Sequence, residues 1–214
     1  MTAVEIESAT PFLVVAFRPS AYLEKLISQA KVKTREIAGD QIYLAHPPHL
    51  TLYVAAFDQP EMVVERCRDL VRQWKRPVLE LSGWHHFGGD VLTGNETLVC
   101  RLSNESMASL RGYQQALLSV LADLRNSTLS ASRYRPHFAS LTPQRQLAVE
   151  EYGFPFIGED WTPHFTIASI AKQNWEAVWL ALEGDPPQGQ ATCDTLAIFL
   201  LRHDFPHAWQ EIPL

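Results

Sequence analysis

The chain has 214 residues, of which 46% are hydrophobic, and a formal net charge of −6 at pH 7. That length is sufficient for one sizeable core, or for two small lobes that share one. The acidic balance argues against the overall positive field that supports non-specific binding to long nucleic acids, but it is compatible with a small nucleotide or an RNA end as the substrate.

Three widely spaced cysteines, Cys67, Cys100 and Cys193, include no CxxC pair. Their odd number favours reduced thiols in small core positions over a disulfide framework. The first residues, MTAVEIESAT, are acidic and lack the features of a signal peptide, and no run approaches the roughly 18 apolar residues of a membrane span. We therefore expect a cytoplasmic monomer without a membrane segment.

Apolar runs predict strands, and apolar residues at helical spacing predict helices. In chain order, we expect a strand at 12–19, a helix at 20–38, a strand at 49–57, a helix at 60–76, strands at 78–87 and 97–103, a long helix at 105–127, a strand at 164–171, a helix at 174–184, and strands at 192–204 and 209–214. Residues 128–160 are rich in Pro, Gly and aromatic residues without a sustained period, which predicts an ordered insertion. This mixture favours a single α+β domain, residues 1–214, of mostly antiparallel sheet with helices on one side.

Two segments repeat the same order of residue types. PPHLTLYV at 47–54 and TPHFTIAS at 162–169 each place a histidine, an apolar residue, a threonine and an apolar residue after a proline. The composition predicts only about 0.2 such tetrads per chain by chance. A single tetrad favours a structural histidine, but the pair favours a function.

Strand geometry places the polar residues of each segment together. Because side chains alternate across a strand, His49, Thr51 and Tyr53 are expected on one face of the first strand, and His164 and Thr166 on one face of the second. Two imidazoles, one neutral and one protonated, can supply the general base and the general acid of a displacement at phosphorus. The threonine hydroxyls would stabilise the charge that develops on the non-bridging oxygens.

The two H-x-T-x motifs, at 49–52 and 164–167, resemble those of the 2H phosphoesterase superfamily, which contains 2'-5' RNA ligase and cyclic phosphodiesterase-like proteins. FGGDVLTG at 87–94 is similar to the family's strand-turn-strand, and DTLAIFLLRHDFPHAWQEIPL at 194–214 is similar to its closing hairpin. The resemblance covers nearly the whole chain. It implies two pseudo-symmetric lobes of mostly antiparallel sheet with outer helices, and an active cleft between the sheets.

The resemblance also implies a function. Its catalytic residues would be His49, Thr51, His164 and Thr166, acting without a metal or another cofactor on a 2',3'-cyclic phosphate or a 2'-5' phosphodiester. The substrate would be a small nucleotide or an RNA end, and the reaction could run backwards as 2'-5' ligation. The residues alone leave open which histidine is the base. They also leave open a binding module that recognises such a nucleotide or RNA end without turning it over.

A third interpretation comes from one segment. LTPQRQLAVEEYGFPFIGEDWTPHFTIAS at 141–169 resembles a subgroup that accompanies bacterial phosphonate-degradation genes. That resemblance favours a phosphonate-pathway enzyme that acts on a ribosyl cyclic phosphate.

The source of positive charge for a phosphate is open. Some relatives place an arginine five residues after the second histidine, where this chain has Ser169. The stretch 124–149 contains four arginines and no acidic residue, namely Arg125, Arg133, Arg135 and Arg145. We expect Tyr53, Tyr134, Arg135 and Ser169 to contact the substrate, whereas a solvated loop is the alternative for the arginines.

Other histidines are weaker candidates for chemistry. His137 follows a proline in RPHFAS but has alanine where threonine is needed, which favours a structural role or a peripheral substrate contact. Three further pairs raise the question of zinc: His46 with His49, His85 with His86, and His203 with His207. No cysteine or carboxylate accompanies them at ligand spacing, so we expect no metal site.

Overall fold

The computed structural model describes residues 10–214, in which seven strands form an antiparallel sheet with the order β2-β1-β6-β3-β4-β5, and β7 pairs with β6. The strands are β1 (Phe12–Pro19), β2 (Leu50–Ala56), β3 (Val78–Phe87), β4 (Glu96–Leu102), β5 (His164–Ile170), β6 (Gln188–Arg202) and β7 (Phe205–Pro213). The helices are α1 (Ala21–Ala38), α2 (Pro60–Val71), α3 (Asn104–Leu121), α4 (Ser127–Ser132), α5 (Pro143–Tyr152) and α6 (Lys172–Leu182), with two short 3-10 helices, η1 (Arg135–Ser140) and η2 (Gly158–Asp160). The expectation about a signal peptide concerns residues 1–9, which lie outside the described residues.

The long strand β6 joins the two halves of the sheet. Its residues 188–192 pair with β3, and its residues 193–201 pair with β1. The two motif strands, β2 and β5, are therefore at opposite ends of the strand order, yet they contact each other because the sheet curls. The expected α+β fold, with two antiparallel halves and outer helices, is confirmed.

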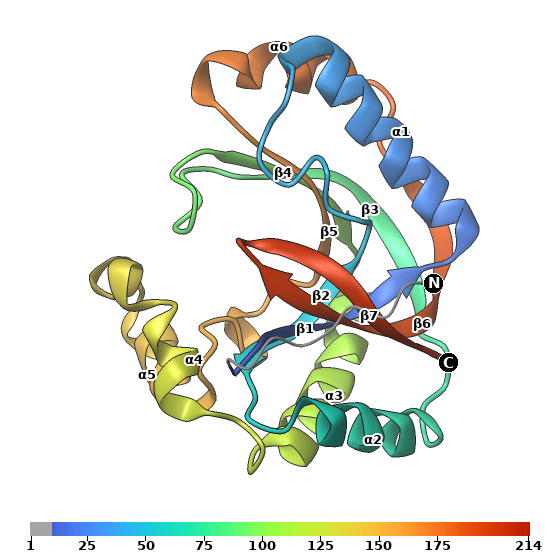
Figure 1. The fold of residues 1–214 in the computed structure, drawn as a ribbon. Coiled ribbons are helices and arrows are strands. Elements are labelled where there is room, and N and C mark those ends of the chain that lie inside the picture. Colours follow the sequence, from blue (N-terminus) through green and yellow to red (C-terminus); the bar gives the residue numbers. More distant parts are fainter. Residues whose placement is uncertain (1–9) are drawn as a thin grey trace.

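Each half of the sheet has its own pair of covering helices (Figure 1). Helices α1 and α6 pack together on the outer side of β3, β4 and β5, and α2 and α3 pack together on the outer side of β1 and β2. Helices α4 and α5 lie beside each other at one side of the molecule, where the yellow part of the ribbon projects from the sheet. No helix within residues 10–214 is long and apolar enough to cross a membrane.

The main core lies between the sheet and these helices, and includes the three cysteines as buried free thiols. A second, smaller apolar cluster lies on the opposite face of β1 and β6. It consists of Val14, Ala16, Ala197 and Phe199, with Val54 and Leu201 packed against them. This cluster lies on the concave side of the curled sheet, where the motif residues also lie.

One expected helix is interrupted. The helix expected at 105–127 ends at Leu121, and a new helix, α4, begins at Ser127. Between them, the backbone N–H of Asn126 donates to the carbonyl oxygen of Ala56 at 2.9 Å, and the Asn126 side chain caps α4 by accepting from Leu129 N. Pairing with the end of β2 and the capping preference of Asn therefore outweigh helix continuation.

Candidate active site

Both motifs lie at the start of an edge strand and line the same cavity. His49 immediately precedes β2, and His164 is the first residue of β5. The cavity has a volume of about 510 Å³, and His49, Thr51, His164 and Thr166 are all part of its lining. Small-ligand sites typically have volumes of roughly 300–1,000 Å³. The structure thus brings the four motif residues together in a cavity of suitable size.

A backbone carbonyl two residues earlier in the chain holds each imidazole. His49 Nδ1 lies 2.7 Å from the carbonyl oxygen of Pro47, and His164 Nδ1 lies 2.7 Å from that of Thr162. Because a carbonyl oxygen only accepts, each neutral ring carries its proton on Nδ1 and keeps the lone pair on Nε2. The proline before each histidine favours an extended conformation of the residue that supplies the carbonyl. The repeated proline thus has a local role in orienting the ring.

Each imidazole also contacts a phenylalanine ring. The ring centroids of His49 and Phe199 are 5.4 Å apart, and those of His164 and Phe87 are 5.1 Å apart. The phenylalanines come from β6 and β3, so each half of the sheet supplies one. Both contacts restrict the orientation of the imidazole and remove water from one side of it.

Each motif strand contains a β-bulge at the fourth residue of its motif. In β2, the register shifts so that Leu52 has no partner on β1, and in β5 it shifts so that Ile167 has no partner on β4. A bulge adds one unpaired residue and breaks the alternation of side chains beyond it. The two halves therefore share the motif and also the irregularity that follows it.

The first bulge changes the position of Tyr53. This side chain is 1% exposed and belongs to the core, and Val54 lines the cavity in its place. The Tyr53 hydroxyl donates to the carbonyl oxygen of Tyr152 at 2.6 Å and accepts from Arg125 at 3.3 Å. The prediction that Tyr53 shares a face with His49 is wrong, because the alternation breaks at the bulge.

Of the other three expected substrate contacts, one lines the cavity. Tyr134 is 2% exposed and forms part of the cavity wall, whereas Arg135 is exposed and outside that wall. Ser169 is buried outside the wall, and its hydroxyl shares a 2.7 Å hydrogen bond with that of Thr93. The cavity has no cationic group at the position where some relatives have arginine.

Two arginines of the 124–149 stretch do line the cavity. Arg133 pairs with Asp204 at 2.8 Å, and Arg145 pairs with Asp160 at 3.2 Å. The sequence pointed to this stretch because it contains arginines and no acidic residue. The carboxylates that pair with the two arginines, Asp160 and Asp204, lie outside the stretch. The guanidinium of Arg145 also lies 5.2 Å from the centroid of the Phe156 ring.

Desolvation governs the electrostatics of the motif histidines. It lowers the pKa of His49 to about 4; the hydrogen bond to the Pro47 carbonyl opposes this shift, and the positive charges of Lys31 and Arg18 add to it. It also lowers the pKa of His164, although the carboxylate of Asp90 opposes that shift. Both shifts favour the neutral ring at pH 7, and an anionic ligand would raise both pKa values.

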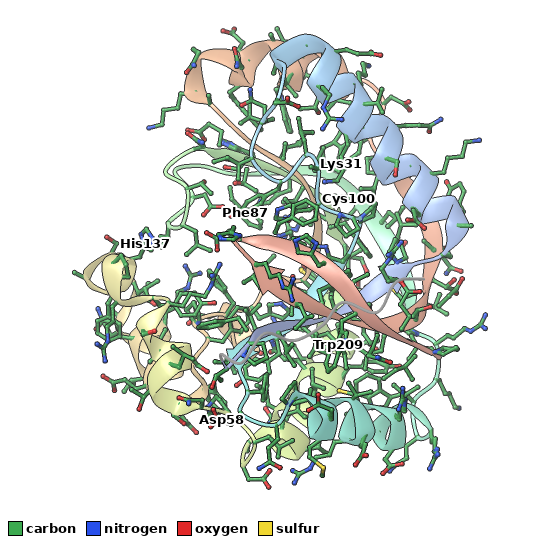
Figure 2. The ribbon with its side chains drawn as sticks, in the orientation of Figure 1. Lys31, Asp58, Phe87, Cys100, His137 and Trp209 are labelled. Carbon is green, nitrogen blue, oxygen red and sulfur yellow. The ribbon has the colours of Figure 1, made fainter. Side chains whose placement is uncertain are left out.

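The rest of the cavity wall suits an aromatic or sugar-bearing ligand. Aromatic side chains form much of it, and they are Tyr43, Phe87, Tyr134, Phe154, Phe156 and Trp161. Within residues 10–214, no group of three or more His, Cys, Asp or Glu side chains has the arrangement needed to hold a metal ion. His137, in η1, lies at the outer edge of the molecule beside α4 and α5 and is not part of the wall (Figure 2).

Two solved structures with TM-scores above 0.5 support the fold, and a third is similar at a lower score. TT0787 of Thermus thermophilus has a TM-score of 0.58 and 15% sequence identity, over 95% of this chain and 97% of that one. A structure described as a phosphoesterase has a TM-score of 0.51 and 14% identity, over 96% and 99% of the two chains. LigT of E. coli, solved with 3'-AMP, has a TM-score of 0.48 and 14% identity, over 96% of each chain.

A family model assigns the chain on sequence grounds. No curated protein sequence matches significantly. The model of the 2'-5' RNA ligase superfamily, however, matches residues 19–204, which include both H-x-T-x motifs and the strands β2 to β6. The chain therefore belongs to the 2'-5' RNA ligase superfamily of 2H phosphoesterases.

Proposed function

We propose that this protein is a phosphodiesterase that opens a 2',3'-cyclic phosphate or cleaves a 2'-5' phosphodiester of a small nucleotide or RNA end, using His49 and His164 as general acid and base. One observation carries the proposal: two imidazoles, each held by the same Nδ1 contact, line one cavity from opposite ends of the sheet. Membership of the superfamily supports phosphoesterase-type or ligase-type chemistry.

Hydrolysis of a cyclic phosphate needs one proton removed and one supplied. The neutral histidine accepts a proton from water at Nε2 while the water oxygen forms a bond to phosphorus. The bond from phosphorus to one ribose oxygen breaks, and the protonated histidine donates its Nε2 proton to that oxygen. In the reverse direction the two roles exchange. Proton removal by one imidazole and proton donation by the other require no metal ion.

The charges around the two rings favour His164 as the protonated partner. The carboxylate of Asp90 raises the pKa of His164, and His85 lowers it by less, whereas Lys31 and Arg18 both lower the pKa of His49. The negative phosphate of a bound substrate would draw a proton onto the site, and it would reside on His164 more readily. We therefore assign the acid to His164 and the base to His49 in the hydrolytic direction.

Hydroxyl and guanidinium groups complete the proposed site. Thr51 and Thr166, each two residues after a histidine on the same strand face, would donate hydrogen bonds to the non-bridging oxygens. Arg133 and Arg145 would supply positive charge once their carboxylate partners reorient, and Tyr134 would pack against the base or sugar. A neutral hydroxyl pair alone would stabilise a dianionic transition state less well.

The test is a substrate panel with EDTA present. Phosphorus NMR would follow 2',3'-cyclic nucleotides, 2'-5' linked dinucleotides and ribosyl cyclic phosphate during incubation with the protein. Conversion of one of them to a ring-opened or cleaved product supports the proposal. Ligand-induced shifts without any product would instead favour the binding module.

A further inference from the structure

The two bulges leave two backbone carbonyls that need hydrogen-bond donors from outside the motifs. The residue at a bulge is outside the strand ladder, so its backbone carbonyl needs another donor. These carbonyls belong to Leu52 and Ile167, each directly after a motif threonine. A donor at either point holds the strand at the position where the catalytic hydroxyl projects.

One donor is a buried lysine. Lys31 lies in α1, on the side of the helix that faces the molecule's interior, and is 7% exposed (Figure 2). Its Nζ donates to the carbonyl oxygen of Ile167 at 3.0 Å and to that of Tyr43 at 2.6 Å. Tyr43 lies in the segment that leads into His49 and has a positive φ of 71°. The lysine therefore connects the bulge of the second motif to the approach to the first.

The other donor is a buried glutamine with the complementary connection. Gln114 lies in α3 and is 1% exposed. Its Nε2 donates to the carbonyl oxygens of Leu52 and Phe156, both at 3.0 Å, and its Oε1 accepts from Gly158 N at 3.1 Å. Phe156 and Gly158 lie in the segment that leads into His164. The glutamine therefore connects the bulge of the first motif to the approach to the second.

The buried contact of Lys31 carries an energetic cost. Burying an ammonium group is costly, and burial lowers the pKa of Lys31 to about 8. Within the described residues its two hydrogen bonds both go to backbone carbonyls, and no carboxylate forms an ion pair with it. An apolar residue at this core position would avoid that cost but would remove the lysine donor from the Ile167 carbonyl and leave the Tyr43 carbonyl with only the backbone N–H of His46, at 3.1 Å.

We propose that Lys31 and Gln114 are paired positioning residues for catalysis, which hold the two histidine–threonine motifs at a fixed separation across the cavity. Each residue donates hydrogen bonds both to the strand of one motif and to the segment that leads into the other motif, so the two motifs cannot shift independently. This inference rests on the proposed function, since the geometry it protects is that of the acid–base pair.

Activity measurements on the full chain test the positioning role. Lys31→Met and Gln114→Met remove the donors with little change of volume. We expect each to lower kcat by about 10- to 100-fold, as small displacements of catalytic groups do, with KM changed less than about threefold. Lys31→Arg keeps N–H donors at this position and should restore kcat to within about fivefold of the wild type.

Matched controls separate positioning from general effects. Lys25→Met, on the same helix, and Gln115→Met, beside Gln114, remove exposed side chains outside the cavity wall, so both should behave as wild type. All variants are assayed well below their melting temperatures. Wild-type kcat in folded Lys31→Met and Gln114→Met would overturn the proposal.

A spectroscopic readout keeps this test separate from that of the proposed function. Long-range proton–nitrogen NMR of the imidazoles should show the Nδ1–H form for His49 and His164 in the wild type. Both Met variants should shift or broaden these signals, and the controls should not. If the wild type turns over no substrate, the proposed function fails and the ring signals alone decide: changed signals support the positioning role, and unchanged signals overturn it.

Discussion

At the scale of single residues, two buried polar side chains, Lys31 and Gln114, donate hydrogen bonds to the strands that carry the motif threonines. The sequence predicts the motif histidines and threonines but not these two residues. A histidine and a threonine two residues apart after a proline can be recognised directly in the sequence, and the repetition of this pattern favours a function. Lys31 and Gln114 occupy positions in amphipathic helices where a polar residue usually indicates a solvated face. Their burial depends on carbonyls exposed by bulges more than 60 residues away along the chain, which a helical pattern does not reveal.

The threonine hydroxyls are expected to act in the transition state. Thr51→Val and Thr166→Val keep the shape of the side chain and remove the donor. Each should lower kcat by about 10²-fold, as loss of one donor to a developing oxyanion does, while KM changes little. Steady-state kinetics on the substrate identified by the panel would measure this.

The matched control for these variants is Thr128→Val, an exposed position in α4 outside the cavity wall. A fall in kcat of the same size in this control, or none in either motif variant, would contradict the role assigned to the hydroxyls.

The lowered pKa of His49 predicts a dependence of stability on pH. The folded state prefers the neutral ring, so this residue contributes its full stability above its usual pKa of about 6.5 and loses it as pH falls toward the folded value of about 4. Between pH 8 and pH 5 the loss amounts to about 2 kcal/mol. Urea denaturation should show that the free energy of unfolding falls less in His49→Gln than in the wild type over this range. An equal fall would mean that His49 is not responsible for this pH dependence.

At the scale of elements, most strands and helices agreed with their sequence patterns, and the disagreements have local causes. The expected strand at 49–57 exists as β2, but its bulge buries Tyr53. The alternating pattern does not reveal this bulge, because the two residues that follow it, Tyr53 and Val54, are both hydrophobic and either could face the core. The stretch at 128–160 forms α4, η1, α5 and η2, whose short lengths hide any helical period.

The turn after α5 is expected to be sensitive to substitution. Gly153 ends the helix with a φ of 66°, and a Cβ at this position would lie 2.3 Å from the Cβ of Ser130 in α4. Gly153→Ala should therefore lower the free energy of unfolding by about 3 kcal/mol, from left-handed strain and the clash together. Thermal or urea denaturation gives the value.

Gly94→Ala separates the two contributions. Gly94 has a φ of 72°, and a Cβ there would meet no atom within 4 Å. This variant should lose only the strain, about 1 kcal/mol. Equal losses in the two variants would show that the contact between α4 and α5 does not constrain the turn.

At the scale of the whole molecule, the meeting of the two motifs is a property of topology. The motifs are more than a hundred residues apart and lie on opposite edges of the sheet, and only its curl along β6 brings β2 and β5 together. Local patterns predicted the strands, whereas the shared cleft was expected only from the resemblance to the 2H phosphoesterases. Strand order and curvature depend on pairings between distant segments, which no single stretch of sequence encodes.

The most direct test of the two-histidine mechanism is phosphorus NMR of His49→Ala and His164→Ala, with EDTA present, on whichever substrate the wild type converts. His137→Ala serves as the control, because this histidine lies outside the cavity wall. We predict that conversion is abolished in both motif variants and unchanged in the control. Conversion at the wild-type rate in either motif variant would contradict the mechanism.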